Sequence, residues 1–235
     1  MKYIIMCGGT YKDFKTPKQL LKVNGEVLVE RTIRLLKENG ITDIAISTNN
    51  PAFDYLDVPI YHHNNKFISC GKQETKKSEF SWLNAYYPTD EPCCYLHGDV
   101  YFSDEAIQKI INTEVEDTMF FCTFDKTDGK THPLNWKGRE PFAYKVQNQA
   151  VFRYAIKKLL KMVDKGLYDG SLPPISWHLY RFLNGYDVKI YATKYTEVNN
   201  IFQTIGDYKV INDYTTDIDK LEDITNIEKI MEDKK

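Results

Sequence analysis

The stretch that decides the fold is Tyr3-Ile4-Ile5-Met6-Cys7-Gly8-Gly9-Thr10, an apolar strand that ends at two glycines. Glycine has no Cβ and readily takes a positive φ, so the backbone of such a turn can come close to a ligand. Backbone N–H groups in a turn of this kind bind phosphate groups. Pro17-Lys18-Gln19-Leu20 follows in a polar loop, and its lysine supplies a positive charge for the same phosphates. Together these residues predict a phosphate-binding site at the end of the first strand.

The segments that follow alternate between helix and strand patterns. Apolar residues recur at helical spacing over residues 27–39 and stop at Gly40, which predicts an amphipathic helix. Short strands are predicted at residues 44–47 and 58–61. A strand, a helix and a strand joined by short connections form a βαβ unit, which predicts parallel pairing and an α/β fold.

The rest of the chain continues the α/β pattern without a linker that would mark a domain boundary. Ser103 is expected to cap the N-terminus of a helix, with acidic residues in its first turn. The other expected strands are residues 93–96, 119–124, 142–146 and 188–191, and the other expected helices are residues 78–86, 152–163, 177–183 and 220–231.

Composition excludes several classes of function. The 235 residues include 31 basic and 33 acidic side chains, and a net charge of −2 argues against a nucleic-acid partner. The apolar run at the N-terminus is too short for a signal sequence or a membrane span. Five cysteines form an odd set without C-x-x-C spacing, so we expect a reduced, cytoplasmic protein without a cysteine metal site.

Asp99 is the sharpest single candidate for chemistry. It follows a predicted buried strand and Gly98, which places its carboxylate at the carboxyl end of the sheet, where open α/β sheets bind ligands. Mg²⁺ binds to proteins through one or two carboxylates together with substrate phosphates. The alternative is an aspartate that only caps the next turn. His97 is a second residue of interest here, and its simplest interpretation is a strand-end histidine bonded to the backbone.

The glycine turn, Pro17-Lys18 and Asp99 together resemble the nucleotidyltransferases, which activate sugars, alcohols and cofactors with a nucleoside triphosphate. The C-terminal Asp217-Ile218-Asp219, followed by Leu221-Glu222-Asp223-Ile224, is similar to the closing motif of that family. The resemblance implies that Asp217 or Asp219 is the second metal ligand beside Asp99, with Asp213 as a third option. Asp219 has an alternative role as the N-cap of the final helix, with Glu222 at capping-box spacing.

The resemblance also implies the fold and the nucleotide site. The fold would be a single-domain, Rossmann-like three-layer sandwich over residues 1–235 with a mixed, mostly parallel sheet. The nucleotide half would span about residues 1–112 and the acceptor half about residues 113–235. Many members carry an arginine just after the glycine turn, whereas this chain has Lys12 and Lys15 there. Ser78 could equally be a helix N-cap. The implied nucleotide-binding residues are Gly8, Gly9, Thr10, Lys12, Lys18, Gly71 and Ser78.

The expected function is a cytoplasmic, Mg²⁺-dependent nucleotidyltransferase with Lys18 and Asp99 as catalytic residues. It would join a nucleoside monophosphate, from CTP in preference to other nucleotides, to a phosphorylated small molecule and release pyrophosphate. The short chain favours the compact cytidylyltransferases. One alternative is a metal-dependent glycosyltransferase, which would need Asp-x-Asp where this chain has Asp99-Val100-Tyr101. The other is a non-catalytic nucleotide-binding module, favoured by the missing arginine.

Residues 125–140 form a long polar stretch that is a candidate for the acceptor site. Predicted connections elsewhere in the chain are short, and long loops in compact domains are usually functional or disordered. Its cationic and aromatic side chains suit a phosphorylated acceptor, and Lys137 and Arg139 are the predicted contacts. The alternative is a surface arm or a contact in a homodimer.

Overall fold

The computed structural model describes residues 1–9, 14–63, 85–123, 141–164, 175–183 and 208–234. Within these ranges seven strands form one sheet in the order β10-β8-β9-β6-β1-β4-β5. In this sheet, as far as the chain is described, β9 runs antiparallel to its neighbours β6 and β8, and the other pairs are parallel. The strands are β1 (Lys2–Met6), β4 (Ile44–Thr48), β5 (Ile60–His62), β6 (Cys93–His97), β8 (Thr118–Cys122), β9 (Pro141–Val146) and β10 (Tyr208–Val210).

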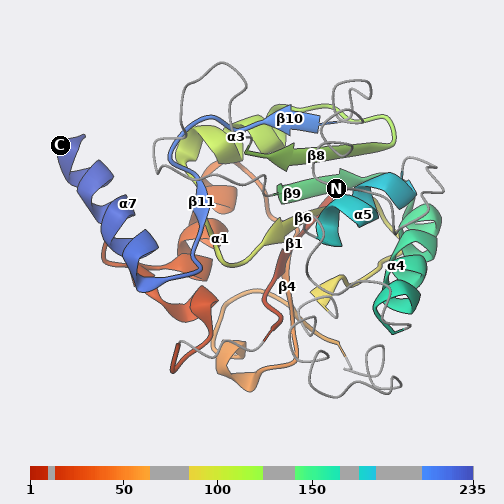
Figure 1. Cartoon of the computed structure of the whole chain (residues 1–235), viewed down its shortest axis with the longest axis horizontal. Helices are drawn as coiled ribbons and strands as arrows, with labels where there is room; N and C mark the ends of the chain where they lie inside the picture. Colours follow the sequence, from red (N-terminus) through yellow and green to blue (C-terminus); the bar gives the residue numbers. More distant parts are fainter. Residues whose placement is uncertain (10–13, 64–84, 124–140, 165–174, 184–207, 235) are drawn as a thin grey trace.

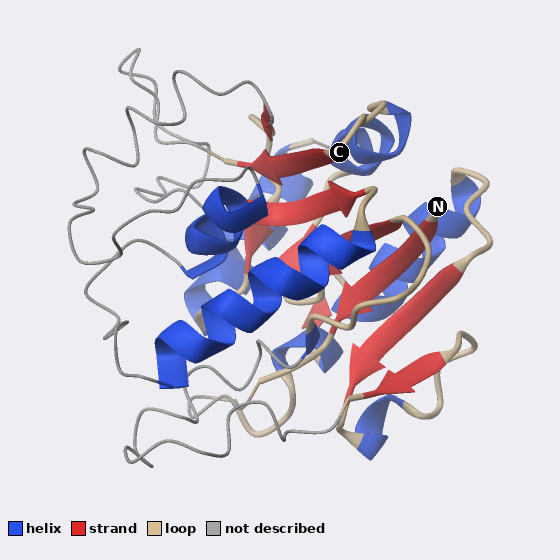
Figure 2. Ribbon diagram, turned by 90° about the vertical axis from the view of Figure 1, so that its right-hand side faces the viewer, coloured by secondary structure: helices blue, strands red, loops and turns tan. Residues whose placement is uncertain are grey.

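Helices cover both faces of this sheet (Figure 1). Helices α1 (Leu28–Glu38) and α3 (Asp104–Asn112) pack on one face, and α4 (Gln149–Asp164) and α5 (Ile175–Leu183) pack on the other. Figure 2 shows the long helix α4 in front of the sheet, roughly along the line of the strands. Side chains of β1 alternate between the two cores, Ile4 on the α4 side and Ile5 on the α1 side, because successive residues of a strand point to opposite faces. The predicted α/β three-layer fold with a mixed, mostly parallel sheet is confirmed.

Two small sheets and a C-terminal helix complete the described fold. The hairpin β2 (Lys22–Val23) and β3 (Glu26–Val27) precedes α1, and β7 (Val100–Tyr101) pairs antiparallel with β11 (Thr216–Asp217). The final helix, α7 (Leu221–Asp233), packs beside β2, away from the main sheet (Figure 1). No described helix combines the length and the apolar composition that crossing a bilayer requires.

Most predicted elements exist with bounds shifted by one to three residues. Ser103 caps α3 as predicted, with its Oγ accepting a hydrogen bond from the N–H of Ala106. Helix α4 begins earlier than predicted because the side chain of Asn148 accepts hydrogen bonds from the first-turn N–H groups of Ala150 and Val151. The two-residue strands and β10 were not predicted, since so few residues carry no periodic signal. The predictions over residues 71–77, 78–84, 125–140 and 188–191 lie outside the described residues.

Candidate active site

The end of β1 and the end of β6 approach each other closely. Gly9 takes a φ of 108°, a conformation that glycine adopts without strain. The N–H of Gly98 donates to the carbonyl of Met6 at 3.0 Å. A Cβ at Gly98 would lie 2.7 Å from both that carbonyl oxygen and the Sγ of Cys7, and 3.0 Å from the Cγ of Gln19. Only glycine at residue 98 lets the Asp99 turn lie this close to the glycine turn.

Lys18 lies between two carboxylates. It begins a short 3-10 helix, η1 (Lys18–Leu20), so the prediction of a polar loop here is wrong: the residue is 5% exposed. Its Nζ lies 3.0 Å from Oδ2 of Asp99 and 2.8 Å from Oδ1 of Asp219. The structure therefore brings together three residues that were predicted from distant parts of the sequence.

The charge of Asp99 is stabilised by this arrangement. Burial is the largest influence and opposes ionisation of the Asp99 carboxyl, but Lys18, His97 and a backbone hydrogen bond together hold the pKa of Asp99 below its ordinary value. A carboxylate beside a buried ammonium is therefore ionised at neutral pH. The local unit carries two negative charges against the one positive charge of Lys18, which suits it to a further cation.

The C-terminal segment reaches the site through the pairing of β11 with β7. Asp217 lies opposite Val100, and the N–H of Ile218 donates to the carbonyl of Asp99 at 2.8 Å. Asp217 thus lies within the strand, and Asp219 follows it and contacts Lys18.

The expectation that Asp219 caps α7 with Glu222 as its partner is wrong. The N-cap is Lys220, and the carboxylate of Asp223 accepts hydrogen bonds from the N–H groups of Asp219 and Lys220. Because Asp223 satisfies these backbone donors, the Asp219 side chain is available to Lys18.

Comparison with known families agrees with this geometry. The model of the MobA-like NTP transferase domain matches residues 3–165, which is more than half of the chain. The chain belongs to the MobA-like NTP transferase family. A comparison with curated proteins finds no match.

Solved structures share the fold of this NTP transferase. One is a protein from Bacillus anthracis described as a glucose-1-phosphate thymidylyltransferase, with 16% identity, a TM-score of 0.51, and coverage of 99% of this chain and 96% of that one. Another is the inositol-1-phosphate CTP transferase from T. maritima, with 13% identity, a TM-score of 0.51, and coverage of 98% and 96%. The CTP:phosphocholine cytidylyltransferase from Streptococcus pneumoniae has 18% identity, a TM-score of 0.44, and coverage of 98% of each chain. At these identities the likeness concerns the fold alone, and it rests on the first two structures.

His97 and Tyr144 form a polar contact near Asp99. Nε2 of His97 lies 3.0 Å from the hydroxyl of Tyr144, so a side-chain hydroxyl is a partner of this ring where a backbone partner was expected. Burial lowers the pKa of His97, which favours the neutral ring. Tyr144 was not predicted as a site residue because it occupies an ordinary alternating position in β9.

Several predicted site residues lie outside the described part of the chain. They are Thr10, Lys12, Gly71, Ser78, Lys137 and Arg139. Of the predicted metal ligands, Asp213 has another role, since its carboxylate accepts hydrogen bonds from the Ser103 hydroxyl and the Thr215 N–H.

Asp99 and Asp219 are candidate ligands for a divalent cation. In the described part of the chain no group of three or more His, Cys, Asp or Glu side chains could enclose a metal. A fully protein-made cage is not required for Mg²⁺, which is commonly held by one or two carboxylates plus substrate phosphates. Asp99 and Asp219, which both contact the Lys18 ammonium, would supply the two carboxylates of such a site.

Proposed function

We propose that this protein joins a nucleoside monophosphate to a phosphorylated small molecule, with release of pyrophosphate. The observation that carries the proposal is Lys18, which is buried between Asp99 and Asp219. Membership of the NTP transferase family supports the same reaction class. CTP is the favoured nucleotide because the sequence motifs resemble those of the small cytidylyltransferases.

The proposed reaction is an in-line displacement. A phosphate oxygen of the acceptor attacks the α-phosphorus of the nucleotide, a new P–O–P bond forms, and pyrophosphate leaves with the electrons of the broken bond. Such chemistry depends on positioning and on neutralisation of charge. Lys18 would neutralise negative charge on the phosphates, and Gly8 and Gly9 would present backbone N–H groups to them. When bound by Asp99 and Asp219, Mg²⁺ would neutralise further phosphate charge.

Asp217 lies close enough in the chain to remain part of the proposed metal site. The other proposed nucleotide contacts are Thr10, Lys12, Gly71 and Ser78, and the proposed acceptor contacts are Lys137 and Arg139. These assignments rest on the sequence alone.

The structure disfavours the glycosyltransferase alternative at one position. An Asp-x-Asp motif would require a second acid at residue 101. Tyr101 is 1% exposed there and pairs with Thr216, so an ionised carboxylate at that position would be buried in the β7–β11 pair. A non-catalytic nucleotide-binding module could have the same arrangement of Lys18, Asp99 and Asp219. A measurement of turnover therefore distinguishes it from an enzyme.

Thermal unfolding with CTP, UTP, GTP or ATP, each with and without Mg²⁺, tests the nucleotide half of the proposal. A ligand at 100 times its Kd adds about 2.7 kcal/mol to the free energy of unfolding, so a selective rise in Tm is expected for one nucleotide. Asp99→Asn keeps the side-chain shape but is a poorer ligand for Mg²⁺, and it should reduce the part of the rise that depends on Mg²⁺. No nucleotide-dependent rise in the parent protein would contradict the proposal.

A further inference from the structure

The ion pair of Asp219 with Lys18 is too weak to hold the segment of chain around Asp219 in place. The side chain of Asp219 is 64% exposed, and exposed ion pairs contribute little to holding a segment in place. Strand β11 has only two residues, Thr216 and Asp217, and so offers few backbone hydrogen bonds. The buried Ile218, whose N–H donates to the carbonyl of Asp99, holds this segment in part, and a further set of contacts adds to it.

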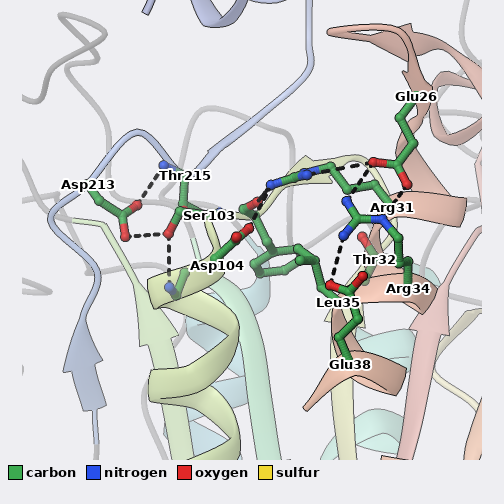
Figure 3. Close-up of polar contacts among 12 residues, drawn as sticks. Glu26, Arg31, Thr32, Arg34, Leu35, Glu38, Ser103, Asp104, Asp213 and Thr215 are labelled. Atoms are coloured by element: carbon green, nitrogen blue, oxygen red, sulfur yellow. Dashed lines mark hydrogen bonds and ion pairs between the residues drawn. The ribbon is translucent and has the colours of Figure 1, made fainter. Parts of the chain in front are cut away.

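That set lies just before β11, where the C-terminal segment meets the start of α3 (Figure 3). The hydroxyl of Ser103 donates to Oδ2 of Asp213 at 2.6 Å. The N–H of Ser103 donates to Oγ1 of Thr215 at 2.9 Å, and the N–H of Thr215 donates to Oδ1 of Asp213 at 2.7 Å. Ser103 and Thr215 are both fully buried, so the bond between them is protected from water, whereas Asp213 is partly exposed.

We propose that Ser103, Asp213 and Thr215 form a clamp that positions Asp219 against Lys18. The clamp joins residues more than a hundred positions apart and is followed directly by the pairing of β11 with β7. The three residues act as positioning residues, because none of their described contacts is to Lys18, Asp99 or Asp219. This inference rests on the proposed function for its catalytic consequence.

Residues 101–104, which lie on the α3 side of the clamp, are held in turn by Arg31. Nη2 of Arg31 in α1 donates to the carbonyl of Phe102 at 3.3 Å and to Oδ1 of Asp104 at 3.0 Å. The guanidinium also lies over the ring of Tyr101, at 4.6 Å from its centroid. Figure 3 shows Arg31 between Glu26 and Asp104. Because α1 packs on the main sheet, Arg31 and the clamp together connect the C-terminal segment to the core of the fold.

Capping of α3 does not explain these contacts. The cap requires only that Oγ of Ser103 accept from the N–H of Ala106 at 2.9 Å. Thr215 takes no part in that bond, so Thr215→Val removes one clamp contact and leaves the helix cap in place. Thr215→Ser keeps the hydroxyl and is the conservative counterpart.

Amide hydrogen exchange tests the clamp without relying on activity. The N–H of Ile218, which donates to Asp99, reports the docking of β11, and the N–H of Ile46 in the main sheet reports global opening. Thr215→Val leaves the buried N–H of Ser103 without its acceptor, so exchange at Ile218 should accelerate about tenfold or more relative to Ile46. In Thr215→Ser, the N–H of Ile218 should exchange at nearly the rate seen in the parent protein. Thr113→Val removes a hydroxyl bond to the Lys109 carbonyl at the other end of α3 and should leave Ile218 unchanged.

Nucleotide turnover tests the positioning role. Thr215→Val should lower kcat/KM for the nucleotide about tenfold or more and raise the Mg²⁺ concentration for half-maximal rate, because displacement of a site group by about 1 Å can cost about 10²-fold. Thr215→Ser should restore both quantities. If Thr215→Val does not fold, Asp213→Ala replaces it. Asp213 is only partly buried, and its removal should change the exchange at Ile218, kcat/KM and the Mg²⁺ dependence in the same direction.

The outcomes separate the two proposals. Parental exchange at Ile218 in Thr215→Val, or equal acceleration at Ile218 and Ile46, would overturn the clamp. Faster exchange with unchanged kcat/KM and Mg²⁺ dependence would overturn its positioning role. A parent protein that turns over no nucleotide would overturn the proposed function, and the exchange data would still decide whether the clamp exists.

Discussion

Lys18 gains its importance from burial as well as from its charge. A lysine in water contributes a screened charge, whereas this ammonium is almost fully buried and lies within 3.0 Å of two carboxylates. The sequence predicted the residue through its place after Pro17. It could not predict the burial, because Asp219 lies 201 positions away in the sequence.

Lys18→Ala should therefore affect both activity and stability. Without the ammonium, Asp99 and Asp219 face each other as like charges, so Tm should fall, and Mg²⁺ should restore part of the loss. Loss of charge stabilisation in turnover typically costs about 10²-fold or more in rate. Lys22→Ala, at an exposed lysine of β2, is the matched control. Near-normal turnover by Lys18→Ala would remove the role proposed for this residue.

His63 makes stability depend on pH independently of the candidate site. Burial and the neighbouring His62 lower the pKa of His63 to about 4, and the described structure gives neither ring nitrogen a hydrogen-bond partner. An unfolded histidine titrates near pH 6.5. The unfolded state therefore binds the proton first, and the free energy of unfolding falls as the pH drops from about 6.5 to about 4.

His63→Leu should flatten that pH dependence. Between pH 7.5 and 5.5 the parent protein should lose about 1 kcal/mol from this residue, and the variant should lose less. Denaturant unfolding at a series of pH values measures the difference. A variant that keeps the whole slope would assign the pH dependence to other groups.

Elements differ in how much of their structure the sequence reveals. The glycine turn after β1 and the Ser103 cap of α3 were predicted because local residue types determine both. The β7–β11 pair was not predicted, since two-residue strands have no periodicity and their pairing depends on contacts across the fold. For the same reason Asp213 was considered as a metal ligand, although the structure uses it to hold Ser103 and Thr215.

Gly98→Ala tests the close approach of β6 to β1. The new Cβ would lie 2.7 Å from the backbone carbonyl of Met6, which cannot rotate away as a side chain can. The Asp99 turn must then shift, so we expect turnover to fall about tenfold or more. Gly40→Ala is the matched control, because a Cβ there meets nothing within 4 Å and costs only the strain of its φ of +81°. Equal turnover in the two variants would show that the approach is not required.

At the scale of the whole molecule, the sheet order brings distant segments together. Strands β1 and β6 are parallel neighbours in the sheet, so the glycine turn and Asp99 both lie at the carboxyl ends of these strands. The sequence predicted this because parallel strands place their carboxyl ends together. It could not predict the His97–Tyr144 contact, which depends on β9 running antiparallel beside β6.

Pyrophosphate release tests the central claim most directly. Each of the four nucleoside triphosphates is incubated with the protein, Mg²⁺ and a pool of phosphorylated small molecules, and products are followed by ³¹P NMR. The account predicts pyrophosphate and a new P–O–P-linked product in equal amounts, only when nucleotide and acceptor are both present, with a rate about 10²-fold or more lower in Lys18→Ala. Pyrophosphate formed equally without an acceptor, or turnover that Lys18→Ala leaves intact, would contradict it.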